Sequence, residues 1–193
     1  MLKILLNPFE KYSEKHLLFF GFLCLFIGSY LGYLLNVHFD RILHLSYVEN
    51  TFLMKPLLQN ILITFLLTIV LYALGKYCNK KTRLIDILTT SLIARVPFYF
   101  LTLFNIKNRN KIIIDKLIKN IEHIQDVTFS TSETIFLFVS TIVGIVILIW
   151  FAILIWNGFK TATNAKTTKE IMLFISTLFI ANLFSFYILQ LIN

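Results

Sequence analysis

The sequence predicts an all-α integral membrane protein, a five-helix transmembrane bundle in which residues 1–193 form a single transmembrane domain. The chain is 58% hydrophobic and has a mean hydropathy of +0.79, whereas soluble domains are about 45–50% apolar. The apolar residues are grouped in blocks of about twenty, the length that a helix needs to cross a hydrocarbon core. These blocks leave no room for a separate soluble domain.

An N-terminal segment with aromatic and basic residues precedes the first block and is expected to lie in the membrane interface. Its sequence Asn7-Pro8-Phe9-Glu10 is typical of a helix start, because Asn caps a helix and Pro is tolerated at the first helical position. No signal-peptidase-like site closes the apolar block that follows, so we expect an uncleaved first span. The five spans are predicted at about 17–35, 57–75, 84–104, 134–156 and 171–191.

Small residues recur four apart in two of the spans. Gly28 and Gly32 form a G-x-x-x-G in the first span, and Ser140 and Gly144 form a similar small face in the fourth. Small faces let helix backbones approach closely in lipid. We therefore predict that these four residues are helix-packing positions.

The segment 36–56 is predicted to be a polar loop between the first two spans. Its piece Leu43–Val48 alternates between apolar and polar residues, as a short strand would. His38, Asp40 and His44 are three possible metal ligands, but three such residues in a flexible loop do not make a site. We predict no metal and no cofactor.

The segment 111–126 is predicted to form an amphipathic helix that lies in the interface plane. Just after it, Ser130 and Glu133 have the spacing of a capping box at the start of the fourth span. One face of the helix is apolar, and Lys and acidic residues occupy the other. The apolar face consists of Ile113, Ile114, Leu117, Ile118, Ile121 and Ile124.

The distribution of basic residues leaves two topologies open. With five spans, the N-terminal side holds 10 of the 18 Lys and Arg residues and the other side 7, which favours a cytoplasmic N-terminus. If 84–104 instead re-enters, broken at Arg95-Val96-Pro97, four spans remain and the counts become 13 and 5. We prefer five spans because this block has full crossing length. Cys24 and Cys78 are interpreted as free thiols.

The third span carries the most unusual residue of the chain, Arg95. It lies 11 residues beyond Leu84, so about 16 Å deep at ~1.5 Å per residue. A charge at this depth is costly and indicates a functional or structural site. Pro97 cannot donate a backbone hydrogen bond, so it is expected to kink the helix and free the Ile93 carbonyl.

Equal depth on the neighbouring spans brings other polar groups into the same layer. Thr64 and Thr68 lie on one stripe of the second span with Asn60, and Asn182 lies on the fifth. We predict an intramembrane polar site made of Arg95, Pro97, Thr64, Thr68 and Asn182. We expect the Arg95 guanidinium to point into the bundle. There it either locks the helices together, with Thr64, Thr68, Asn182 or the Ile93 carbonyl as acceptors, or meets an anion such as a lipid phosphate.

Three segments together resemble bacterial members of the Yip family, the Ypt/Rab-interacting-protein-like membrane proteins. They are NPFEKYSEKHLLFFGFL (7–23), DILTTSLIARVPFYF (86–100) and WNGFKTATNAK (156–166). The resemblance implies five helices, a cytoplasmic N-terminus and an external C-terminus. Eukaryotic relatives are associated with vesicle traffic and Rab GTPases, but a bacterial chain has no Rab partner. The resemblance transfers no catalytic residues.

These features favour a non-catalytic multi-pass membrane protein that organises or adapts membrane components. The alternative is a small transporter or lipid-handling protein that uses Arg95, although the chain has no internal repeat and no pair of broken helices. We predict no enzyme, because the sequence lacks H-E-x-x-H, G-x-S-x-G and paired carboxylates at membrane depth. The basic loops indicate contact with the bilayer and anionic headgroups, not nucleic acid. Other membrane proteins are candidate partners, and the expected location is the bacterial cytoplasmic membrane.

Overall fold

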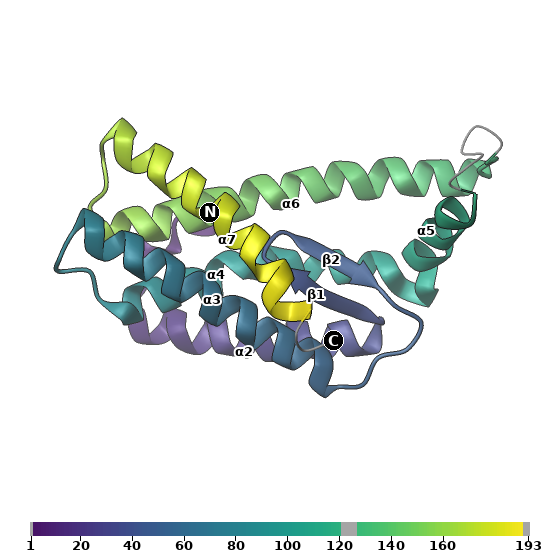
Figure 1. Ribbon diagram of the computed structural model, residues 1–193, viewed down its shortest axis with the longest axis horizontal. Helices are drawn as coiled ribbons and strands as arrows, with labels where there is room; N and C mark the ends of the chain where they lie inside the picture. Colours follow the sequence, from purple (N-terminus) through teal and green to yellow (C-terminus); the bar gives the residue numbers. More distant parts are fainter. Residues whose placement is uncertain (1, 121–126, 191–193) are drawn as a thin grey trace.

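The computed structural model describes residues 2–120 and 127–190, which form helices and a small β-hairpin (Figure 1). Five helical segments are long and apolar enough to cross a membrane, which confirms the predicted all-α multi-span fold. The elements are α1 (Leu2–Leu6), η1 (Pro8–Glu10), α2 (Glu14–Leu34), β1 (Val37–Arg41), β2 (His44–Tyr47), α3 (Met54–Cys78), α4 (Leu84–Leu101), η2 (Thr102–Asn108), α5 (Arg109–Lys119), α6 (Thr131–Thr163) and α7 (Thr168–Gln190).

Helix α4 is the centre of the bundle. It packs against α2, α3 and α6, while α7 packs on α3 and on the hairpin (Figure 1). In its most apolar stretch 67% of the residues are buried, against 17–44% in the other four spans. Its hydroxyl residues Thr89, Thr90 and Ser91 donate to carbonyls one turn back, so these polar side chains are buried without needing partners on other helices.

Glycines set the close approach of α2 to α4. A Cβ added at Gly21 would lie 2.7 Å from the Cβ of Leu92, and one at Gly28 would overlap the ring of Tyr99. Gly32 instead faces the hairpin. A Cβ at Gly144 would meet nothing within 4 Å, so the expectation that this glycine packs against another helix of the chain is corrected.

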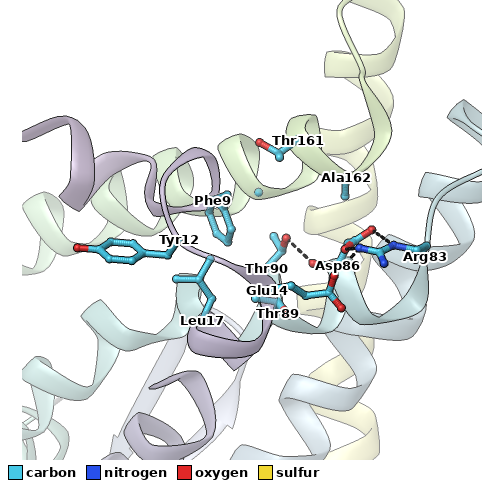
Figure 2. A pocket seen from close by; sticks show the side chains of 11 residues that line it. Phe9, Tyr12, Glu14, Leu17, Arg83, Asp86, Thr89, Thr90, Thr161 and Ala162 are labelled. Carbon is cyan, nitrogen blue, oxygen red and sulfur yellow. Dashed lines mark hydrogen bonds and ion pairs between the residues drawn. The ribbon is translucent and has the colours of Figure 1, made fainter. Parts of the chain in front are cut away.

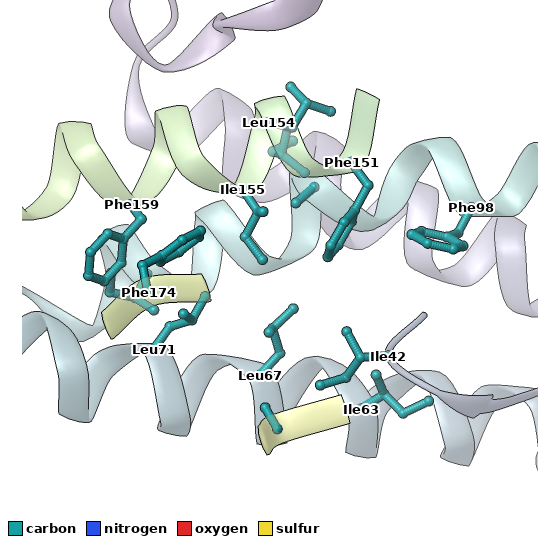
Figure 3. Packing of buried hydrophobic residues seen from close by; sticks show 14 of the residues in the cluster. Ile42, Ile63, Leu67, Leu71, Phe98, Phe151, Leu154, Ile155, Phe159 and Phe174 are labelled. Atoms are coloured by element: carbon teal, nitrogen blue, oxygen red, sulfur yellow. The ribbon is translucent and has the colours of Figure 1, made fainter. Parts of the chain in front are cut away.

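The apolar core joins all five long helices and the hairpin. Phe98 of α4 meets Phe151 of α6 edge-on at 5.1 Å between ring centroids, and Phe159 meets Phe174 of α7 at 4.9 Å. Figure 3 shows Ile42, from the hairpin turn, in this cluster near residues of α3. The core therefore extends continuously from the helices onto the hairpin.

The segment between α2 and α3 is not the polar surface loop that the sequence predicted. Val37, Phe39 and Ile42 are 0–1% exposed, and β1 pairs antiparallel with β2. The strand expected from the alternation at 43–48 is present as β2. The prediction of a polar loop was wrong because Val37 and Phe39, which alternate along β1, point into the bundle.

The N-terminal segment begins differently from the prediction. Asn7-Pro8 starts only the short 3₁₀ helix η1, and the Asn7 side chain makes no capping hydrogen bond. The long helix α2 begins at Glu14. Trp150 and Asn157 of α6 donate to the carbonyls of Leu5 and Leu6, at 2.9 and 2.8 Å, and thereby hold α1 along α6.

Helix α4 is continuous through Pro97 to Leu101. The break on which the four-span alternative depended, at residues 95–97, is therefore absent. The chain then turns through η2 into α5, which ends at Lys119; residues 121–126 of the predicted amphipathic helix lie outside the described residues. Ile113 is buried and Ile118 is 60% exposed, while the flat orientation on a membrane stays a prediction.

Helix α6 is longer than expected at both ends. Its start is fixed by the predicted capping box: the Ser130 hydroxyl accepts from the Glu133 backbone N–H, and the Glu133 carboxylate accepts from the Ser130 N–H. Lys116 of α5 pairs with the same carboxylate at 3.2 Å. At ~1.5 Å per residue its 33 residues span about 50 Å, more than a hydrocarbon core of ~30 Å.

Candidate functional site

The predicted intramembrane charge, Arg95, is buried in the middle of the bundle. Its side chain is 1% exposed. One terminal nitrogen, Nη2, donates to Oδ1 of Asn60 on α3 at 2.8 Å, and Nη1 donates to the carbonyl of Ile42 in the hairpin turn at 3.4 Å. The guanidinium therefore joins α4 to α3 and to the hairpin, and points into the bundle as predicted.

Asn60 extends this network to α2. Its amide nitrogen donates to the Ser29 hydroxyl at 2.9 Å, and that hydroxyl donates to the Leu25 carbonyl at 2.7 Å. Asn60 is completely buried. An asparagine suits this place because its amide accepts from a cation on one side and donates on the other.

The partners of Arg95 are neutral. No described Asp or Glu lies within ion-pair distance of it. The Phe39 ring lies 6.0 Å from the guanidinium carbon, at the limit for a cation–π contact. The Tyr99 hydroxyl interacts electrostatically with the guanidinium, but neither it nor Nε of Arg95 has a partner in hydrogen-bonding geometry. The charge thus depends mainly on the Asn60 and Ile42 oxygens.

The hairpin is held by further side chains of the surrounding helices. Backbone N–H groups buried away from water need acceptors, and irregular backbone at membrane depth is tolerated only where protein supplies them. Gln59 of α3 accepts from the Phe39 N–H. On α7, Ser185 accepts from the Ile42 N–H and Asn182 from the Leu43 N–H. These distances are 3.0 Å for Phe39–Gln59, 3.2 Å for Ile42–Ser185 and 3.0 Å for Leu43–Asn182.

Four helix side chains therefore form one socket for the hairpin: Gln59, Arg95, Asn182 and Ser185. Three of them accept hydrogen bonds from hairpin N–H groups, and Arg95 donates to a hairpin carbonyl. We call this set the hairpin socket. It draws on α3, α4 and α7, which lie apart in sequence, and its geometry fixes the hairpin turn against the centre of α4.

The predicted polar site is only partly brought together. Arg95 bonds to Ile42 and Asn182 bonds to Leu43, the next residue of the hairpin. Pro97 is buried in α4, two residues after Arg95. Thr64 and Thr68 are buried on α3, where Thr68 donates to the carbonyl of Thr64 within its own helix.

The expected acceptors of Arg95 are corrected by this geometry. No hydrogen bond joins Arg95 to Thr64, Thr68, Asn182 or the Ile93 carbonyl; the acceptors are Asn60 and Ile42. Counting equal depths on straight helices ignored both helix tilt and the reach of an arginine side chain. Asn60 stands on the same stripe as Thr64 and Thr68 in the sequence, but no local signal distinguished it as the acceptor or indicated Ile42.

The groups gathered here can bind and orient, but they do not form a nucleophile–base pair. Near the site, His44 pairs with Asp40 at 2.8 Å, while His38 bonds to the Thr51 hydroxyl at 2.8 Å. Burial, with a smaller contribution from Lys55, lowers the pKa of His38 to about 4. Over the described ranges, no three His, Cys, Asp or Glu side chains gather as metal ligands would. Both cysteines are free thiols.

Comparison with known proteins gives one finding. A family model described as the Yip1 domain matches residues 5–189. This match includes all five long helices, the hairpin and the hairpin socket. No curated protein and no solved structure matches the chain.

Proposed function

Because the chain belongs to the Yip1 domain family, we propose that this multi-pass integral membrane protein is non-catalytic and organises or adapts other membrane components. The proposal rests on the hydrogen bonds that Arg95 makes inside the bundle. Its guanidinium is buried and bonded to Asn60 and to the hairpin backbone. This buried charge inside an apolar span is therefore used to hold α3, α4 and the hairpin together.

The alternative, a small transporter or lipid-handling protein, requires Arg95 to meet an anion. An anion would have to displace the Asn60 amide or the Ile42 carbonyl from a side chain that is 1% exposed. Loss of the Ile42 carbonyl as a partner would also remove the hydrogen bond between α4 and the hairpin turn. The geometry therefore favours the organising role over anion handling.

The surfaces left for partners are apolar along the spans and basic at one end. Exposed side chains such as Phe138 and Ile145 of α6 and Phe179 of α7 offer a lipid-facing or partner-facing surface. We place the N-terminus and the basic loop before α4 in the cytoplasm of a bacterial cell, with the C-terminus outside. In this orientation the loop meets anionic headgroups.

The test compares the wild-type chain with Arg95→Gln after reconstitution into liposomes. We expect wild-type vesicles to show no more anion flux or lipid scrambling than empty vesicles, and Arg95→Gln to unfold at lower temperature. Thr68→Val is the control, because its hydroxyl bonds only within α3. Flux through wild-type vesicles that is lost in a normally folded Arg95→Gln protein would establish the alternative.

A further inference from the structure

A cavity lies at the end of the bundle where α4 begins and α6 ends. It has a volume of about 280 Å³, close to the lower end of the ~300–1,000 Å³ range of small-molecule sites. Figure 2 shows its lining, which comes from η1, the first turns of α2 and α4, and the last turns of α6. The cavity therefore lies at one end of the spans, where we expect lipid headgroups, and it shares no residue with the hairpin socket.

Three charged side chains form the polar wall of this cavity. Arg83 donates from Nε to Asp86 at 3.0 Å and from Nη2 to the other Asp86 oxygen at 2.6 Å, and also bonds to Glu14. These hydrogen bonds raise the pKa of Arg83 above its usual value. Two carboxylates face one guanidinium, so the wall carries one negative charge in excess. A carboxylate offers about four lone-pair sites, so Glu14 and Asp86 keep free acceptor capacity.

The rest of the lining is aromatic, apolar or hydroxyl-bearing. Phe9, Tyr12 and Leu17 line the side away from Arg83, with the Tyr12 ring pointing away from the two carboxylates (Figure 2). The hydroxyls of Thr89 and Thr90 donate to carbonyls of their own helix, which leaves their oxygens as acceptors only. A cation is favoured by aromatic faces, carboxylates and such oxygens together.

We propose that this cavity binds a phospholipid headgroup that carries a primary ammonium, as phosphatidylethanolamine does. Nη2 of Arg83 occupies the place between the two carboxylates, so the ammonium bonds to the remaining lone pairs of Glu14 and Asp86 on the cavity side, and the phosphate lies toward the exposed side of Arg83. The acyl chains of the lipid leave the cavity along the outer, lipid-facing surface of the helices, because Leu17 at its inner side belongs to the buried core. This proposal does not depend on the organising role of the protein.

The chemistry separates this ligand from other common headgroups. A primary ammonium has three N–H donors for the two carboxylates, whereas the quaternary ammonium of phosphatidylcholine has none. Phosphatidylglycerol brings only negative charge to a wall that is already negative. Because hydrogen bonds to charged groups are among the strongest in proteins, we expect about tenfold preference for the ethanolamine lipid.

In the experiment, the purified chain is incubated with phosphatidylethanolamine, phosphatidylcholine or phosphatidylglycerol with identical acyl chains. Bound lipid is then counted by native mass spectrometry. The wild type should retain phosphatidylethanolamine about tenfold better than the other two. Glu14→Gln and Asp86→Asn should each abolish this preference. Glu10→Gln is the matched control: this carboxylate pairs with Lys3 at 3.5 Å and does not line the cavity.

Soluble phosphoethanolamine forms a second arm, since it carries the same ammonium and phosphate. Displacement of the lipid by this compound would assign recognition to the headgroup alone, and its failure to compete would assign the site to the membrane lipid. Equal retention of the three lipids by the wild type overturns the proposal, even where a variant fails to fold. Preferential retention of phosphatidylglycerol also overturns it, because Arg83 would then be an anion site.

Discussion

The hydrogen bond between Arg95 and Asn60 can be tested by a double-mutant cycle. Asn60→Leu removes the 2.8 Å acceptor and leaves the guanidinium with the 3.4 Å contact to the Ile42 carbonyl. It also removes the bond to Ser29. Losing a charge-assisted bond and a neutral one predicts a loss of about 2–4 kcal/mol in the free energy of unfolding.

Arg95→Leu should be milder, because the cost of burying the charge disappears together with its bonds. The double variant should therefore be less stable than Arg95→Leu only by the loss of the Asn60–Ser29 bond, about 0.5–1.5 kcal/mol. Hydrogen bonds inside membranes average ~0.6 kcal/mol and reach ~1.7 kcal/mol in such cycles. Since one partner here is charged and both are buried, we expect a coupling energy at the upper end, about 1.5–2 kcal/mol.

The assay is reversible unfolding in mixed micelles, followed by circular dichroism. Thr68→Val combined with Arg95→Leu gives the control cycle, in which the two effects should add to within ~0.5 kcal/mol. A coupling energy below ~0.5 kcal/mol for Asn60 and Arg95 would refute the reasoning. So would an Asn60→Leu protein as stable as the wild type.

Three further predictions concern packing, topology and pH. Gly28→Ala should cost about 1–3 kcal/mol because its methyl would overlap a ring of α4, whereas Gly144→Ala faces open space and should cost nothing; equal losses in the unfolding assay would contradict this. With the other cysteine replaced, Cys78 should stay unlabelled by an impermeant maleimide in intact cells and react after permeabilisation; labelling of intact cells would reverse the orientation. The pKa of His38 lies at about 4 in the fold against 6.5 for a free side chain, so the unfolded chain binds a proton first and stability should fall as the pH drops from 6.5 toward 4. His38→Gln should flatten this dependence and the exposed control His16→Gln should not; identical pH profiles would contradict the assignment.

Much of the helical framework could be predicted, because span length and hydropathy follow directly from the thickness of a bilayer. The capping box at Ser130 was equally local, since its two partners are three residues apart. Arg95 was recognisable for the same reason: a charge inside an apolar block is visible without knowledge of the fold. Which groups receive its hydrogen bonds was not, because they lie 35 and 53 residues away.

The second strand of the hairpin was visible in its own alternation, but its burial in the bundle could not be predicted from its own residues. Its sequence contains His38, Asp40 and Arg41, which indicate a solvated loop when read alone. It enters the bundle because distant side chains accept from its backbone, and Gln59 and Ser185 meet it only in the folded protein. A local pattern records which residues are apolar, but not which backbone groups find a partner.

The hairpin socket also sets an order of events during synthesis. Residues 37–47 leave the ribosome early, yet two of their acceptors, Asn182 and Ser185, follow 139 and 143 residues later. Until α7 has been inserted, the N–H groups of Ile42 and Leu43 lack these acceptors and cannot enter an apolar environment without large cost. Seating of the hairpin is therefore a closing step of membrane insertion, and a chain truncated before α7 would leave this segment on the water side.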